Sequence, residues 1–271
     1  MSADQGATFR ALHQHGAAFI LANAWDIGSA KMLAGLGAQA IATSSAAHAF
    51  TLGLPDGKVD RDTALAHAQS IVAAVNLPVQ GDFEDGYSDT PEGTAKTVRM
   101  AAEVGLAGIC IEDLRQGTQT AYGFDLAVEK IRAAAAAARA LPRDFVLTAR
   151  ADGIMVDAYD IDEAIRRLKA FSAAGADCLY APMTKSFADL AQIVAQTDKP
   201  VNALVAGEYT AYGRADFAKI GVARLSLGSA LARTTHRVIH DAATAMFGAG
   251  EFSALGNAMN GGIVDALLTK E

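Results

Sequence analysis

Residues 77–87 read Leu-Pro-Val-Gln-Gly-Asp-Phe-Glu-Asp-Gly-Tyr, a short apolar segment that runs directly into the carboxylates Asp82, Glu84 and Asp85. Like charges held close together are costly unless a positive group lies between them. Mg²⁺ is a hard cation that prefers oxygen ligands of this kind. The same order recurs in residues 106–113, an apolar run that ends in Glu112 and Asp113. Two successive strands that end in acids predict a metal site at one end of a barrel.

The rest of the chain alternates short apolar runs with longer helical patterns. Strand-like runs begin near Phe19, Ala40, Val79, Ala107, Phe145, Cys178, Val201 and Ala223. Helical patterns lie between them, among others over residues 61–75, 92–104, 126–139, 162–173 and 187–196. We therefore predict an α/β fold, a (β/α)₈ TIM-type barrel, which typically takes about 250 residues. Glycine follows several of the helices, at Gly37, Gly105, Gly175 and Gly221, where it supplies a left-handed cap.

The chain shows no internal boundary and ends in a long tail. No linker rich in Pro or Ser divides the 271 residues, so we expect a single barrel domain over residues 1–271. A helical extension over about residues 229–271 exceeds what one closing helix needs. Two arrangements remain open for it. It packs against a neighbouring subunit, or it folds over its own barrel.

Composition excludes several classes of partner. The net charge of −7 and the pI near 5.4 argue against nucleic acid, because phosphate binding needs a basic surface. No apolar stretch approaches the roughly 18 residues of a membrane span, and the N-terminus lacks a secretory signal pattern. Cys110 and Cys178 both lie in apolar runs, which is typical of reduced core residues. We expect a cytoplasmic protein.

Polar residues gather where the predicted strands end, which is the catalytic face of such a barrel. They are Asn23, Trp25, Asp26, Ser44, Ser45, Asp82, Glu84, Asp85, Glu112, Asp113, Arg150, Asp152 and Asn202, with His48 just beyond the second strand. A cation held by carboxylates, with Arg150 opposite, would clamp a small dianion. The structural alternative is a ring of salt bridges, such as Glu112 with Arg150. The five acids that follow the third and fourth strands, set against one arginine, leave an excess of negative charge, which favours a bound cation.

Two other patterns do not support a function. Residues 53–58 are similar to a phosphate-binding loop, but they have one spacer too few and Val59 where Ser or Thr is needed. His236 and His240 are spaced to share a helical face, yet no third metal ligand is evident. We expect them on a helix surface or at a subunit contact.

Several short motifs together resemble the isocitrate lyase/phosphoenolpyruvate mutase superfamily over nearly the whole chain. They are residues 23–30 (NAWDIGSA), 43–45 (TSS), 81–87 (GDFEDGY), 111–113 (IED), 148–152 (TARAD), 200–204 (PVNAL) and 221–226 (GVARLS). The resemblance implies a barrel that swaps its last helix between subunits, usually in a dimer of dimers and hence a homotetramer. It also implies Mg²⁺-dependent chemistry, with Mn²⁺ as the alternative metal, on small 2-oxo acids.

The resemblance also implies roles for individual residues. Asp82 would bind the metal directly, and Glu84 and Glu112 would act through metal-bound waters. Ser44 and Ser45 would hold the carboxylate or enolate oxygen of the substrate. Trp25 would form a wall of the site, and Arg150 would bind the leaving anionic group.

The departures from the family pattern narrow the choice among the family's reactions. The loop over residues 114–123 lacks the Cys-Gly-His motif of the isocitrate-cleaving lyases and the Lys and Asn of the phosphonomutases, and Glu84 replaces the usual aspartate. We predict a lyase that breaks a C–C bond of a small 2-oxo dicarboxylate, as in oxaloacetate decarboxylation. Tyr122 or His48 would deliver the proton, and Asn202 would contact substrate. The alternatives are C–P chemistry, as in a phosphonopyruvate hydrolase or phosphonomutase, and a barrel that binds a metabolite without turnover.

Overall fold

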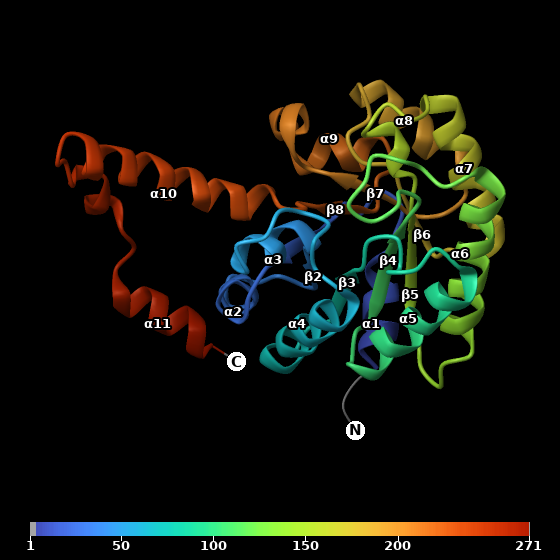
Figure 1. Ribbon diagram of the computed structural model, residues 1–271, viewed down its shortest axis with the longest axis horizontal. Coiled ribbons are helices and arrows are strands. Elements are labelled where there is room, and N and C mark those ends of the chain that lie inside the picture. The colour runs from blue at the N-terminus through green and yellow to red at the C-terminus, as the bar shows by residue number, and fades with distance from the viewer. Residues whose placement is uncertain (1–3, 271) are drawn as a thin grey trace.

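A computed structural model describes residues 4–270 and contains a closed barrel of eight parallel strands in sequential order (Figure 1). The strands are β1 (Phe19–Ala24), β2 (Ile41–Thr43), β3 (Val79–Asp82), β4 (Gly108–Glu112), β5 (Val146–Arg150), β6 (Cys178–Tyr180), β7 (Val201–Leu204) and β8 (Arg224–Ser226). β8 pairs with β1, which closes the barrel. The predicted (β/α)₈ barrel and its eight strands are therefore confirmed.

The helices that follow the strands form the outer layer. They are α2 (Ile27–Gly35), α3 (Ser45–Thr51), α4 (Arg61–Ala74), α5 (Pro91–Glu103), α6 (Phe124–Arg139), α7 (Ile161–Ala174), α8 (Phe187–Gln196) and α9 (Arg214–Lys219), with short 3₁₀ turns at η1 (Asp152–Ile154) and η2 (Gly207–Ala211). The predicted left-handed glycines are all confirmed: the φ angles are 99° at Gly37, 94° at Gly105, 109° at Gly175 and 92° at Gly221.

One helix was not predicted. α1 (Gln5–Leu12) precedes the barrel and carries Phe9, which is buried with Phe19 and Val146 in a cluster of its own. Phe9, His13 and Phe19 make edge-to-face contacts with one another. The side chain of Asp4 caps the helix by accepting from the amide of Gly6. α1 thus contributes to the packing of the barrel core.

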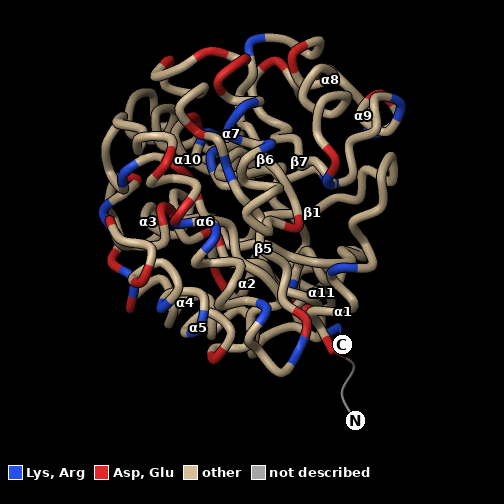
Figure 2. The backbone as a smooth tube through the Cα atoms, turned by 90° about the vertical axis from the view of Figure 1, so that its right-hand side faces the viewer, with Lys and Arg blue, Asp and Glu red and all other residues tan. Residues whose placement is uncertain are grey.

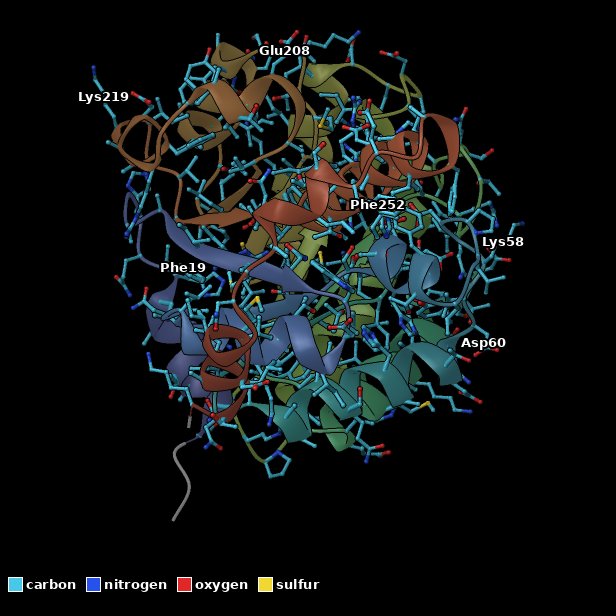
Figure 3. All side chains as sticks on the ribbon, turned by 90° about the vertical axis from the view of Figure 1, so that its left-hand side faces the viewer. Phe19, Lys58, Asp60, Glu208, Lys219 and Phe252 are labelled. Carbon is cyan, nitrogen blue, oxygen red and sulfur yellow. The ribbon has the colours of Figure 1, made fainter. Side chains whose placement is uncertain are left out.

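The C-terminal segment leaves the barrel. α10 (Ala230–Gly248) extends away from it, and the chain then passes through η3 (Ser253–Asn257) to α11 (Gly261–Thr269), which contacts α2 (Figure 1). We call residues 230–269 the arm. Its large apolar side chains are exposed, including Phe247 at 88% and Val238 at 65%, and Phe252 lies on the side of the arm that faces the viewer in Figure 3.

The outer surface of β1 shows the consequence of this path. Ile20 points outward from β1 and is 48% exposed. In a (β/α)₈ barrel, a helix after the last strand normally covers this side. Among the described residues, α10 extends away instead of covering it. The arm and Ile20 therefore present two separate apolar surfaces.

The surface carries both signs of charge. Lys, Arg, Asp and Glu are interspersed over the face shown in Figure 2. No helix in the described part of the chain combines the length and the apolar character that a membrane span requires.

Candidate active site

Three charged side chains end three neighbouring strands: Asp82 ends β3, Glu112 ends β4 and Arg150 ends β5. Glu112 and Arg150 are directly paired in the parallel register, and Asp82 is paired with Cys110 two residues earlier on β4. Because the strands are parallel, their carboxyl ends meet at one face of the barrel. The structure thus brings together the acids and the arginine that the sequence predicted to share a site.

The guanidinium of Arg150 is surrounded by carboxylates. Nη1 lies 3.0 Å from Oδ1 of Asp82, and Nη2 lies 3.1 Å from Oε2 of Glu112. Asp152, at the start of η1, binds both Nε (2.9 Å) and Nη2 (2.5 Å) in a fork. Asp152 is thus a close partner of Arg150, and three acids surround one cation in a largely buried cluster.

Asp82 is oriented by the turn after β2. Its Oδ2 accepts hydrogen bonds from the amide (3.0 Å) and the hydroxyl (2.8 Å) of Ser45, and its own amide donates to Oγ1 of Thr43 (2.8 Å). Ser44 has a different task, because its hydroxyl caps α3 by accepting from the amide of Ala47. The two serines therefore lie beside the acids, and their predicted substrate contacts stay a prediction.

The acids exceed the positive charge near them. Glu84 adopts a positive φ of 49°, and its carbonyl accepts from the amide of Glu112 (2.9 Å), so the two residues are neighbours. Burial, followed by the charges of Asp82 and Asp56, raises the pKa of Glu84 to about 8. Burial also holds the pKa of Glu112 well above its ordinary value despite Arg150. This electrostatic cost favours a further positive group at the site.

Asp56 belongs to this cluster and was missed in the sequence. It lies in the loop between α3 and α4, at the mouth of the site, where desolvation and the charge of Asp82 raise its pKa. The loop is held by a close backbone approach, since a Cβ on Gly57 would meet Cα of Gly117 at 2.5 Å. Asp56 falls within residues 53–58, which we had compared only with a phosphate loop. The available signal was an acid in the segment that connects the second strand to the helical pattern beginning at residue 61.

Two other predicted acids, Asp113 and Asp85, support the site without joining the cluster around Arg150. Asp113 accepts from the amide of Asp152 (2.7 Å), from Tyr159 (2.7 Å) and from Arg167 (2.8 Å). It thereby fixes the turn that presents Asp152 to Arg150. Asp85 accepts from the amide of Tyr87 (3.0 Å) and lies 3.8 Å from Nζ of Lys130. Both carboxylates are buried and have cationic neighbours.

The predicted proton donors lie elsewhere. The hydroxyl of Tyr122 is 2.5 Å from Asp85 and 2.7 Å from Asp89, and in the described structure it forms no hydrogen bond with the Arg150 cluster. His48 stacks on His67, with ring centroids 3.6 Å apart, and its Nε2 is buried without a hydrogen-bond partner. His67 in turn binds the carbonyl of Trp25 (2.9 Å), the half-buried residue after β1. The stack therefore links the loops of the first two strands.

Asn202 lies inside the barrel rather than at its open end. Its Oδ1 accepts from Nε of Arg224 (2.8 Å), and its Nδ2 donates to Oγ of Ser226 (2.8 Å). The side chain is fully buried. The structure does not bring it to the acids, so the predicted substrate contact has no support from its position.

Comparisons with known proteins agree with this geometry. The family model described as phosphoenolpyruvate phosphomutase matches residues 9–247. An uncharacterized protein of Mycobacterium tuberculosis is 35% identical over 224 residues, 82% of each chain. An oxaloacetate decarboxylase of Ectopseudomonas mendocina is 30% identical over 223 residues, 79% of this chain and 74% of the relative.

A solved structure from Burkholderia cenocepacia J2315, provisionally assigned as a lyase/mutase, is 40% identical with a TM-score of 0.94 and covers 99% of this chain and 97% of its own. The family match covers most of the barrel and all the acids described above. The chain therefore belongs to the phosphoenolpyruvate phosphomutase family, and with it to the isocitrate lyase/phosphoenolpyruvate mutase superfamily of lyases and mutases.

Proposed function

We propose that the protein is a Mg²⁺-dependent lyase that breaks a C–C bond of a small 2-oxo dicarboxylate, with oxaloacetate decarboxylation as the simplest case. The observation that carries the proposal is Arg150, which is enclosed by Asp82, Glu112 and Asp152 at the open end of the barrel. One guanidinium among several acids can exchange its carboxylate partners for an anionic substrate once a second cation takes over those acids. The kinship with an oxaloacetate decarboxylase supports the choice of reaction.

The residues fit a hard divalent cation. Among the described residues, no three His, Cys, Asp or Glu side chains already form a ready-made ligand group. The donor set is nevertheless all carboxylate, and its excess charge suits Mg²⁺, which keeps several waters and needs few direct protein ligands. Asp82 would bind the ion directly, with Glu84 and Glu112 holding its waters; Mn²⁺ is the alternative. Such a cation, when bound, stabilises negative charge on the 2-oxo group.

The remaining steps use this chain's own groups. Arg150 orients the carboxylate that will leave, so that the bond between it and the neighbouring carbon can break. The electrons of the broken bond pass to the 2-oxo group and form an enolate as CO₂ leaves. The carbon that carried the departing carboxylate then takes one proton. Ser45 keeps Asp82 in place through two hydrogen bonds. We do not assign the proton to Tyr122, because its hydroxyl is bound to Asp85 and Asp89.

C–P chemistry is the second candidate, and the matched family model favours it by its description. Phosphonopyruvate carries a phosphonyl group that Arg150 could bind in the same way. Hydrolysis or transfer of that group needs an in-line acceptor. The loop over residues 114–123 offers Arg115, Gln116 and Thr118 beside a cleft, but no acidic or histidine acceptor. We therefore rank it behind decarboxylation.

The test is proton NMR of the protein with Mg²⁺ and a panel of oxaloacetate, substituted 2-oxo diacids, 2-methylisocitrate and phosphonopyruvate. We expect pyruvate from a diacid at a rate above that of Mg²⁺ alone, lost with EDTA and with Asp82→Ala. Asp62→Ala, which removes an exposed carboxylate of α4, is the matched control. Consumption of phosphonopyruvate alone would favour C–P chemistry. Binding of these acids without turnover would support a binding protein and contradict the proposal.

We further propose that a second copy of the chain covers the arm. Phe247 and Val238 on the arm and Ile20 on β1 are exposed apolar surfaces of one subunit, and burying them against a partner would recover hydrophobic free energy. An exchange of arms between two subunits in a dimer or tetramer would cover both surfaces. We also retain the proposed cytoplasmic location, because both cysteines are buried and unpaired.

A further inference from the structure

Arg224 is an arginine in the barrel interior whose partners are all neutral. It belongs to β8 and is only 1% exposed. Its Nε donates to Oδ1 of Asn202 (2.8 Å), and its Nη1 donates to Oε1 of Gln80 (2.7 Å) and lies 3.1 Å from Nε2 of His13. None of these groups carries a negative charge. A buried guanidinium without a counter-charge is costly, so this arrangement calls for an explanation.

His13 does not supply the missing charge. Its Nδ1 lies 2.8 Å from the carbonyl of Phe9, which can only accept, so Nδ1 carries the hydrogen and Nε2 is free to accept from Arg224. Burial, followed by the charge of Arg224, lowers the pKa of His13 to about 3. The ring is therefore uncharged at neutral pH and gives Arg224 no counter-charge.

One nitrogen of the guanidinium remains unused. Nε and Nη1 account for three of the five N–H groups of Arg224. Within residues 4–270, Nη2 makes no hydrogen bond and no carboxylate forms an ion pair with Arg224. Two N–H groups of Arg224 are thus free for a further acceptor, and Arg224 lines a small cavity.

The cavity is lined by both arginines. Arg224 and Arg150 both line it, together with Asn23, Thr43, Tyr180 and Ser226. Its volume is about 40 Å³, room for one or two groups of the size of water and too little for a dicarboxylate. Asp82 lines it as well, and a carboxylate repels an anion. Both oxygens of Asp82 are, however, already bound by Ser45 and Arg150.

We propose that this cavity is a binding site for a single small monovalent anion of the halide class, chloride in the cell, with the Nη2 group of Arg224 as its main donor. The cavity shares Asp82 and Arg150 with the proposed active site, whereas Arg224 lies outside the group of acids that would hold the metal. The proposal does not depend on which bond the enzyme breaks. The anion supplies the counter-charge that Arg224 lacks. The guanidinium of Arg224, which has no acidic partner, attracts an anion.

Bromide gives a direct test, because it replaces chloride and can be located by anomalous scattering. Crystals of the full chain soaked in NaBr are expected to show an anomalous peak in the cavity beside Nη2 of Arg224. In solution, NaCl or NaBr at about five times Kd should raise Tm by about 2–4 °C over sodium gluconate of equal ionic strength. Arg224→Met should lose this rise, and Arg132→Met, which removes an exposed arginine of α6, should keep it.

Two results would overturn the proposal. One is water alone in the cavity of the bromide-soaked crystals. The other is an equal halide-dependent rise in Tm in the wild type and in Arg224→Met. Should Arg224→Met fail to fold, Arg224→Lys and the wild-type crystals decide, because the crystallographic result needs no variant. None of these readouts depends on enzymatic activity, so failure of this proposal and failure of the proposed function can be told apart.

Discussion

Arg150, which is largely buried, and Arg224, which is fully buried, lie in the same barrel in opposite surroundings. Arg150, at the open end, is bound to three carboxylates and lies near two more acids. Arg224, in the interior, is bound only to neutral oxygen and nitrogen atoms. A guanidinium among too many acids can release some of them to a cation and turn to an anionic substrate. A guanidinium without an acidic partner is held in place by its neutral partners and contributes chiefly to structure.

The largest expected effect comes from Arg150. Arg150→Gln removes the group that would orient the leaving carboxylate, so we expect kcat/KM to fall by about 10²–10³-fold or more. Initial rates of pyruvate formation measure it. Arg150→Lys keeps the charge but not the fork with Asp152, and it should recover only part of the loss. Wild-type rates in Arg150→Gln would contradict the assigned role.

Arg224 should affect stability before activity. Arg224→Met leaves buried oxygens on Gln80 and Asn202 without their donor, and we expect the free energy of unfolding to fall by about 3 kcal/mol. Urea unfolding at pH 7 measures this loss. We expect a smaller loss in Arg150→Gln. An equal loss in the two variants would contradict the structural role that we assign to Arg224 alone.

The lowered pKa of His13, a neighbour of Arg224, predicts how the free energy of unfolding depends on pH. Its pKa is about 3 in the fold and near 6.5 when unfolded, so the unfolded chain binds the additional proton. The contribution to stability is therefore complete above pH 6.5 and is lost as the pH falls towards 3. Each pH unit in that range lowers the free energy of unfolding by at most about 1.4 kcal/mol. Unfolding curves at pH 6.5 and 5 should differ less in His13→Asn than in the wild type.

A substitution in the arm should have the smallest effect on the stability of the barrel. Phe247→Ser removes an apolar side chain that is 88% exposed in one subunit, so the fold of that subunit should hardly change. If a second copy covers the arm, the variant should dissociate at higher concentration than the wild type. Sedimentation velocity measures the difference. Identical monomeric profiles for both proteins would rule out the arm as a subunit contact.

Much of this organisation could be predicted from the sequence because it depends on local pattern. The strands and their order follow from apolar runs, and the cluster of Asp82, Glu112 and Arg150 follows from strand ends that meet at one face. Contacts that depend on three dimensions could not be predicted. Nothing local in the sequence distinguishes Glu84, near the cluster, from Asp85, which turns to Tyr122 and Lys130.

The same limit applies to residues that lie on loops or inside the barrel. Asp56 reaches the acids only because its loop packs against residue 117, a contact between distant segments. Asn202 ends up at Arg224 because residues of β7 alternate between the interior and the outside. The path of the arm depends on packing between helices, and the sequence left its two possible arrangements open.

The most direct test of the account is the rate of pyruvate formation from oxaloacetate in the presence of Mg²⁺, compared between wild type and Asp82→Asn. Asp82→Asn keeps the size of the side chain but removes the charge that the cation needs. We predict turnover above the Mg²⁺-only rate in the wild type, loss on adding EDTA, and a fall to the Mg²⁺-only rate in the variant. Equal metal-dependent rates in the two proteins would contradict the assignment of the acids and of Arg150 to a metal-assisted lyase.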